Sequence, residues 1–245
     1  MLILIAIILG IVEGLTEFLP VSSTGHLIVI GHALDFSGPK AATFQIFIQL
    51  GAILAISWLY WPRFMRLLDF SRNLGLQGKR GLMLIGLTTL PAVIAGFFLH
   101  GIIKNDLFQP LTVAIGLFVG GVIILVFESL PHKMPTKSLD DITPRQALCV
   151  GIAQLAALWP GVSRAGSTII GGVLFGLDRK TAVEYSFLIA VPVMVAATSY
   201  DLYKAISAGT VQGSDAPLFA TGFVTAFIAA TFAVTLFFFI VSPRG

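Results

Sequence analysis

Two apolar stretches of the chain are interrupted by short turns, and the most unusual polar residues lie at these two breaks. The first break carries Glu13, Glu17 and His26, and the second, in the other half of the chain, carries Arg164. Ionisable side chains inside apolar stretches are costly, and they usually pair with one another at functional sites. We therefore expect the two breaks to meet in one polar site.

The first break has the residue types of an activated nucleophile. Glu13 and Glu17 are spaced i, i+4, so on a helix they share one face, where close carboxylates favour a proton or a cation between them. Ser23 and His26 are about one helical turn apart, so the imidazole is predicted to reach the hydroxyl, the minimum for an activated nucleophile. Two further hydroxyls could cap the next helix and bind substrate: Ser22 and Thr24.

The second break has the residue types of an anion site. The guanidinium of Arg164 carries a permanent charge and a fork of donors that matches phosphate oxygens. The helix start that follows the break would add free backbone N–H groups. Three nearby hydroxyls could bind the same anion: Ser163, Ser167 and Thr168. The two breaks together predict phosphoryl transfer or hydrolysis.

The carboxylate pair also bears on cofactors. Glu13 and Glu17 would repel a diphosphate if both were charged, so we expect a divalent cation between them. Carboxylate oxygens suit a hard cation such as Mg²⁺ or Ca²⁺. Nothing in the sequence calls for an organic cofactor.

Composition places these breaks in a membrane. The 245 residues are 56% hydrophobic and only 11% charged, whereas a soluble domain has roughly 25% charged residues. The net charge of +3 is modest and spread over loops, which argues against a nucleic-acid partner. The only cysteine, Cys149, excludes an internal disulfide and a cysteine-based metal site. We expect an all-α integral membrane protein with bilayer lipid around it.

Five stretches are long enough to cross a bilayer, which takes about 20 residues: Ala41–Trp61, Gly81–His100, Thr112–Leu130, Ala182–Tyr203 and Leu218–Val241. Two others, Leu2–Ala33 and Gln146–Gly176, contain the breaks, and each of their arms is about half a span. We interpret both as re-entrant helix-loop-helix hairpins. No lysine or arginine precedes Lys40, so the beginning of the chain does not read as a secretory signal.

The placement of lysine and arginine predicts the orientation. After five crossings, one side of the membrane receives most of these residues: Arg63, Arg66, Arg72, Lys79, Arg80, Lys133, Lys137, Arg145, Arg179, Lys180 and Arg244. The other side receives only Lys40, Lys104 and Lys204. The richer side should be cytoplasmic. The first hairpin then enters from the outside and the second from the cytoplasm.

The two halves are therefore predicted to be inverted-topology repeats within one membrane domain of residues 1–245. Repeat one covers about 1–140 and repeat two about 141–245, and repeat two is expected to lack its last span. Gln45 and Glu184 follow the two breaks at nearly the same distance, so Glu184 is a candidate for a supporting role. Residues at span ends or in loops are expected to face water or to take no catalytic part: Glu128, Asp201, His32, His100 and His132.

At these residues the chain resembles the undecaprenyl-diphosphate phosphatase family, the membrane enzymes linked to bacitracin resistance. The stretch from Glu13 to His26 matches the first family signature without departure, and Pro160 to Thr168 matches the second with Ala165 in place of a frequent serine. Further similarity covers four segments: Ile48–Gly51, Ala157–Pro160, Glu184–Pro192 and Asp201–Lys204.

The resemblance implies removal of the terminal phosphate from undecaprenyl diphosphate, which regenerates the lipid carrier for peptidoglycan synthesis, cell-wall biogenesis and cell shape. It also implies a bacterial plasma membrane location with the site on the outer side. The oligomeric state, including a homodimer, stays open. The resemblance carries functional roles to six residues: Glu13, Glu17, Ser23, His26, Arg164 and Thr168.

A rival hypothesis is a transporter or flippase for polyprenyl phosphate that uses the same anion site, because inverted repeats with broken helices are common among transporters. Transport needs no nucleophile and base at hydrogen-bonding distance, so the spacing of Ser23 and His26 favours the enzyme. A structural scaffold ranks last because it leaves Arg164 unexplained.

Overall fold

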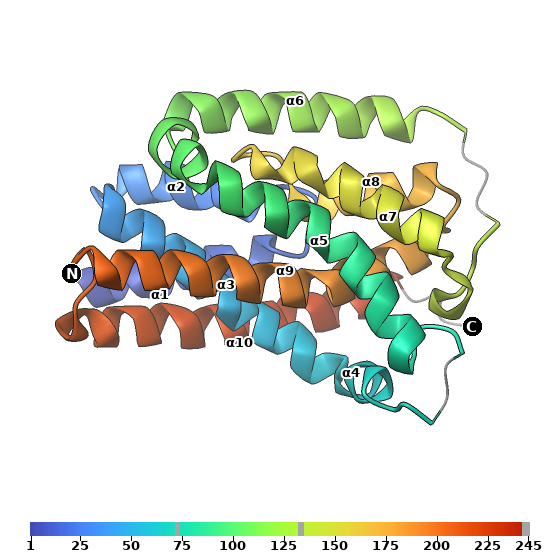
Figure 1. The fold of residues 1–245 in the computed structure, drawn as a ribbon. Helices are drawn as coiled ribbons and strands as arrows, with labels where there is room; N and C mark the ends of the chain where they lie inside the picture. Colours follow the sequence, from blue (N-terminus) through green and yellow to red (C-terminus); the bar gives the residue numbers. More distant parts are fainter. Residues whose placement is uncertain (72–73, 132–134, 242–245) are drawn as a thin grey trace.

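The computed structural model describes residues 1–71, 74–131 and 135–241, with side chains as far as residue 236. Within these ranges the backbone is mostly helical, and the one β-contact is an isolated bridge between Thr136 and Leu177. The helices lie side by side along one long axis (Figure 1). The prediction of an all-α polytopic fold is confirmed.

Five helices are long and apolar enough to cross a membrane: α3 (Pro39–Leu59), α5 (Gly78–Ile102), α6 (Pro110–Glu128), α9 (Arg179–Ser207) and α10 (Ala216–Val241). They confirm the five predicted spans, with ends that differ by a few residues. The start of α9 shows why, because the side chain of Asp178 accepts a hydrogen bond from the N–H of Thr181 and so begins the helix earlier. Short helices extend or join the spans: α4 (Trp61–Leu67), the π-helix η1 (Ile103–Leu107), η2 (Leu139–Asp141) and η4 (Gly213–Asp215).

The outward faces of the spans are covered with apolar side chains. Phe98 on α5 is 77% exposed, and Phe118 and Leu125 on α6 are 74% and 73% exposed. In water, apolar surface of this extent would drive association. A lipid surrounding accepts it without cost, so the structure agrees with a multi-pass membrane protein.

Both broken stretches form helical hairpins. The first consists of α1 (Leu2–Thr16) and α2 (Ser23–Ala33), and the second of α7 (Pro144–Ala153), the 3-10 helix η3 (Gln154–Leu158) and α8 (Arg164–Leu174). The first begins and ends at the end of the bundle where α3 starts, and the second at the opposite end (Figure 1). Their turns, which we call the two tips, therefore lie inside the bundle.

Local chemistry explains each turn. Ser22 has a left-handed backbone (φ 61°), and its hydroxyl accepts from the N–H of Gly25 to start α2. In the second tip Gly161 takes φ 96°, and the hydroxyl of Ser163 accepts from the N–H of Gly166 to start α8. Each tip thus ends in a serine that caps a helix pointing away from the centre of the bundle.

Helix α6 holds the two tips together. A Cβ on Gly25 would meet the side chain of Leu117, and a Cβ on Gly116 would clash with the carbonyl of Pro160. A Cβ on Gly161 would likewise clash with the backbone of Val113. Glycines at these three contacts let α6 approach both tips closely.

Helices from one half of the chain pack against helices from the other half. Helix α1 packs mainly against α10, and α7 packs mainly against α5, while α3 and α9 pack on each other between them. Each hairpin therefore packs against a span from the other half, as expected of two repeats that pack together. The division of the domain near residue 140 stays a prediction.

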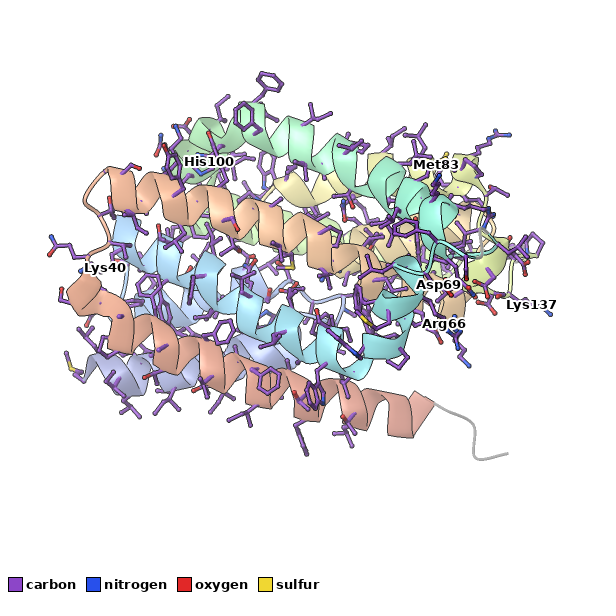
Figure 2. The ribbon with its side chains drawn as sticks, turned by 60° about the horizontal axis from the view of Figure 1, so that its bottom comes forward. Lys40, Arg66, Asp69, Met83, His100 and Lys137 are labelled. Atoms are coloured by element: carbon purple, nitrogen blue, oxygen red, sulfur yellow. The ribbon has the colours of Figure 1, made fainter. Side chains whose placement is uncertain are left out.

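The charged ends of the bundle agree with the crossing count. Lys40 and His100 lie toward one end, and Arg66 and Lys137 lie at the other (Figure 2). Four residues named in the sequence analysis lie outside the described residues: Arg72, His132, Lys133 and Arg244.

Candidate active site

The centre of the site is a carboxylate that joins the two tips. Glu17 caps the C-terminal end of α1 and is 6% exposed. Its Oε1 accepts a hydrogen bond from Nη2 of Arg164 at 2.9 Å, and its Oε2 accepts from the hydroxyl of Ser23 at 2.5 Å. One side chain therefore links the end of α1 to the first residues of both α2 and α8.

Arg164 is fixed from several directions. Its Nη1 donates to the backbone carbonyl of Ser186 at 3.0 Å, while its Nε is buried with no hydrogen-bond partner among the described residues. The hydroxyl of Thr168 lies 2.7 Å from that of Ser186 and also donates to the carbonyl of Arg164. The guanidinium is thus held in place while its Nε remains without an acceptor in the part of the chain that the structure describes. Such a free donor suits binding of an anion.

Ser186 was missed by the sequence analysis. It lies on α9 and is 1% exposed. The available signal was its position two residues after Glu184, in the segment where the two halves were compared. A serine in a membrane helix gives no stronger signal, because most such hydroxyls only bond to their own backbone.

The structure differs from the sequence prediction on His26. The Ser23 hydroxyl donates to Glu17, and Nδ1 of His26 lies 2.8 Å from the carbonyl oxygen of Ser22. Helical side chains lean toward the N-terminus of their helix. Ser23, the first residue of α2, therefore reaches back to the end of α1, and His26 takes the carbonyl of Ser22, four residues before it.

Glu13 is the least satisfied group in the site. It is fully buried one helical turn before Glu17, and neither carboxylate oxygen has a hydrogen-bond partner among the described residues. A buried carboxylate without a partner is expensive, so it calls for a proton or a cation.

The donor set partly fits a hard cation. The buried oxygens of Glu13 have no hydrogen-bond partner among the described residues, whereas those of Glu17 are engaged by Arg164 and Ser23. In the described part of the chain, no cluster of three or more His, Cys, Asp or Glu residues could hold a metal ion by itself. A cation here would need oxygens from hydroxyls or from a phosphate group in addition to Glu13.

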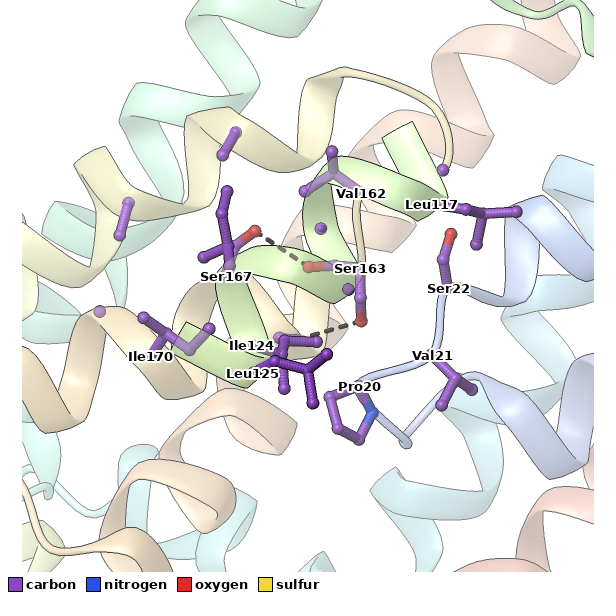
Figure 3. A pocket seen from close by; sticks show the side chains of 18 of the residues that line it. Pro20, Val21, Ser22, Leu117, Ile124, Leu125, Val162, Ser163, Ser167 and Ile170 are labelled. Atoms are coloured by element: carbon purple, nitrogen blue, oxygen red, sulfur yellow. Dashed lines mark hydrogen bonds between the residues drawn. The ribbon is translucent and has the colours of Figure 1, made fainter. Parts of the chain in front are cut away.

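A pocket of about 550 Å³ opens beside the tips, between α6 and α8. Ser22 from the first tip and Ser163 and Ser167 from the second line it (Figure 3). The Ser167 hydroxyl donates to the carbonyl of Ser163 at 2.9 Å. We call this cavity the tip pocket. The rest of its lining is mainly apolar, so a polar end adjoins a surface suited to a hydrocarbon chain.

Several predicted site residues do not line this pocket, among them Glu17, Ser23 and Arg164. Thr24 lines a second cavity on the side of α5 and α9, and Thr168 is turned toward Ser186. The other two polar residues compared between the halves are not part of the Glu17 contacts. Gln45 donates to the carbonyl of Leu27 at 3.2 Å, and Glu184 is half-buried two residues before Ser186 on α9.

The expectation that Asp201 faces water was wrong. Asp201 is 2% exposed, and its Oδ1 accepts from Nζ of Lys104 at 2.5 Å and lies 3.2 Å from Nε2 of His100. The π-helix η1 carries Lys104 against α9 and so buries the carboxylate. Glu128, by contrast, is exposed and pairs with Arg179 at 2.6 Å.

Comparison with known proteins identifies the family. A family model described as "Bacitracin resistance protein BacA" matches residues 6–245. The chain is 53% identical over 232 residues to the undecaprenyl-diphosphatase of Nitratidesulfovibrio vulgaris, covering 95% of this chain and 87% of the relative. It is 51% identical over 243 residues to undecaprenyl-diphosphatase 1 of Bacillus cereus, covering 99% and 91%. The chain therefore belongs to the bacitracin resistance protein BacA family.

Proposed function

We propose that this protein is a membrane hydrolase that converts undecaprenyl diphosphate to undecaprenyl phosphate and inorganic phosphate, and so recycles the lipid carrier for peptidoglycan synthesis. The observation that carries the proposal is the contact of Glu17 with both Arg164 and Ser23 beside the tip pocket. The names of the relatives support the same reaction.

Substrate binding follows from the shape and charge of the site. The polyprenyl chain lies along the apolar lining of the tip pocket, and the diphosphate lies at the hydroxyls of Ser22 and Ser163. Arg164 does not line the pocket but directly follows Ser163 in the chain, and we propose that the diphosphate reaches its guanidinium past this polar end. The buried Nε of Arg164 is the donor left over for a phosphate oxygen. In a water-poor setting such a charged contact is strong, and it strengthens as charge develops in the transition state.

We assign the first proton transfer to Glu17 rather than to His26, because the Ser23 hydroxyl donates its hydrogen bond to Glu17. The Ser23 oxygen forms a bond to the terminal phosphorus, the bond from that phosphorus to the bridging oxygen breaks, and undecaprenyl phosphate leaves. The hydroxyl proton passes to the carboxylate of Glu17, 2.5 Å away. Water then hydrolyses the phosphoserine and releases phosphate, with His26 one helical turn away as the second candidate base.

A divalent cation completes the proposal. Glu13, with some contribution from Glu17, would hold Mg²⁺ or Ca²⁺ together with substrate oxygens. The ion would neutralise phosphate charge that the two glutamates would otherwise repel.

We further propose that both hairpins are re-entrant in a bacterial plasma membrane and that the site opens to the outer side. The two hairpins start from opposite ends of the bundle, and the lysine- and arginine-rich loops gather at the end where the second begins. This end would be cytoplasmic. The oligomeric state stays open.

Purified protein in detergent with undecaprenyl diphosphate tests the function directly. The proposal expects release of inorganic phosphate, with loss of that release in Arg164→Ala and unchanged release in the exposed control Arg179→Ala. A transporter of polyprenyl phosphate has nothing to cross in detergent. Absence of phosphate release from well-folded wild-type protein would therefore favour the transporter and contradict the enzyme.

A further inference from the structure

A second polar cluster lies away from the tips, near the end of the bundle where the first hairpin begins. Lys104 on η1, His100 on α5 and Asp201 on α9 line a cavity of about 310 Å³. With the phenol of Tyr200 they are the ionisable side chains in its lining, which is otherwise mostly apolar or small. The same lining includes Thr24 and Pro160, one from each tip. It therefore borders both tips as well as this cluster, although Glu17, Ser23 and Arg164 are not in its lining.

Two nitrogen donors of the cluster converge on one carboxylate oxygen. Nζ of Lys104 is 2.5 Å and Nε2 of His100 is 3.2 Å from Oδ1 of Asp201, and Lys104 also donates to the hydroxyl of Thr43 at 2.9 Å. The second oxygen of Asp201 is buried with no hydrogen-bond partner among the described residues. Asp201 therefore binds the two donors through one oxygen only, and within the described ranges its other oxygen lacks a hydrogen bond. An oxygen of another anion could bind the same donors in its place.

Lys104 also borders a third cavity, of about 340 Å³. That cavity is lined by residues around the chain turns at this end of the bundle, among them Ser37, Gly38 and Gln109. Lys104 therefore lines both this cavity and the cavity of about 310 Å³. The π-helix that carries it is a rare conformation that is frequent at functional sites.

We propose that Lys104 and His100 form a second phosphate-binding site, in which a phosphate group displaces Asp201 on its way between the tips and the outer end of the bundle. The ligand is a phosphate anion, either free or as the head group of a lipid monophosphate. Its role as an exit or entry point rests on the proposed function, whereas the binding itself does not.

Equilibrium dialysis of radiolabelled inorganic phosphate against the full chain in detergent tests the proposal. All measurements use an Arg164→Gln background, which removes the cation of the tip site. We expect residual phosphate binding in that background, and at least a tenfold loss of affinity when Lys104→Gln is added. Lys40→Gln is the matched control, because it removes an exposed ion pair with Asp215 at the same end, and it should leave the affinity unchanged.

Asp201→Asn distinguishes a phosphate-binding site from an ion pair whose only role is to hold α5 against α9. It removes the competing anion with little change in shape, so phosphate affinity should rise at least threefold. A fastening role predicts no rise. The proposal is overturned if the Arg164→Gln protein binds no phosphate, if Lys104→Gln leaves the residual binding intact, or if Asp201→Asn does not tighten it.

A competition arm identifies the source of the phosphate group. Displacement of labelled phosphate by saturating farnesyl phosphate assigns the site to the lipid head group. Persistence of the label assigns it to the free anion released by the reaction. Because these assays need no turnover, they report on the second site even if the protein fails to hydrolyse undecaprenyl diphosphate.

Discussion

At the scale of single residues, the account depends on how each carboxylate is engaged. Glu17 is fully engaged, with Arg164 on one oxygen and Ser23 on the other. Glu13 is buried a turn away, and within the described part of the chain neither of its oxygens has a hydrogen-bond partner. In the proposed mechanism these two chemically identical side chains have different tasks: Glu17 orients the reacting groups, and Glu13 binds a cation.

Ser23→Ala should reduce phosphate release by at least about 100-fold, because it removes the oxygen that attacks phosphorus. The control is Ser57→Ala on α3, whose hydroxyl only donates to the carbonyl of Ile53 in its own helix. Rates of phosphate release from purified variants check this. A Ser23→Ala protein with nearly normal turnover would show that water attacks directly.

Chelation should stop turnover, and added Mg²⁺ or Ca²⁺ should restore it. Glu13→Gln should raise the metal concentration needed for half-maximal activity by about tenfold or more, because its carboxylate is the proposed main protein ligand. Titration of chelator-treated protein with each ion measures this. Full activity in excess chelator would rule out the cation.

The residue scale also shows where sequence reasoning stops. Residue types and spacing identified both tips, because charged groups in apolar stretches are rare. Spacing alone could not decide the partner of Ser23, since the choice between Glu17 and His26 depends on where α1 ends. Ser186 and the burial of Asp201 depend on contacts between helices distant in sequence, which no local pattern records.

At the scale of elements, the tips are positioned by glycines that let helices approach closely. Hydropathy was enough to predict the five spans and both hairpins. Most predicted span ends differ from the observed ones by a few residues, whereas the end at Val241 matches. At the start of α9 the difference comes from the cap Asp178. The contact of α6 with both tips could not be predicted, since it joins Gly25, Gly116 and Gly161 to residues far away in the sequence.

Gly161→Ala should destabilise the protein and reduce turnover together. The new side chain would sit at φ 96° and clash with the backbone of Val113, and the strained conformation alone costs about 1–3 kcal/mol. Gly86→Ala on α5 is the control, because nothing lies near its Cβ position and alanine favours the helix. Thermal unfolding in detergent measures both. An equal effect of the two substitutions would argue against the tight contact.

At the scale of the whole molecule, two hairpins that start at opposite ends meet in the middle of one bundle. Each packs against a span from the other half of the chain. This arrangement places charged tips inside the bundle and leaves apolar faces on the outside, so one lipid substrate can meet both environments.

Cysteine labelling of intact cells should report the orientation. In a Cys149→Ser background, Leu2→Cys and Lys40→Cys should react with an impermeant thiol reagent from outside, whereas Arg66→Cys should react only after permeabilisation. If α1 and α2 together made one broken span, Leu2 and Lys40 would lie on opposite sides. Two separate crossings would also return the chain to the same side, but α2 has only 11 residues, too few to cross alone. Opposite accessibility of Leu2→Cys and Lys40→Cys would contradict the predicted topology.

The central claim is that Glu17 from one hairpin and Arg164 from the other act as one unit, and a double-mutant cycle on phosphate release tests it most directly. Glu17→Gln and Arg164→Gln should each lower kcat/KM by about 100-fold or more, and the double variant should be within about threefold of the worse single variant. If the two losses instead multiply, to about 10⁴-fold or more, the residues act independently and the shared site is wrong.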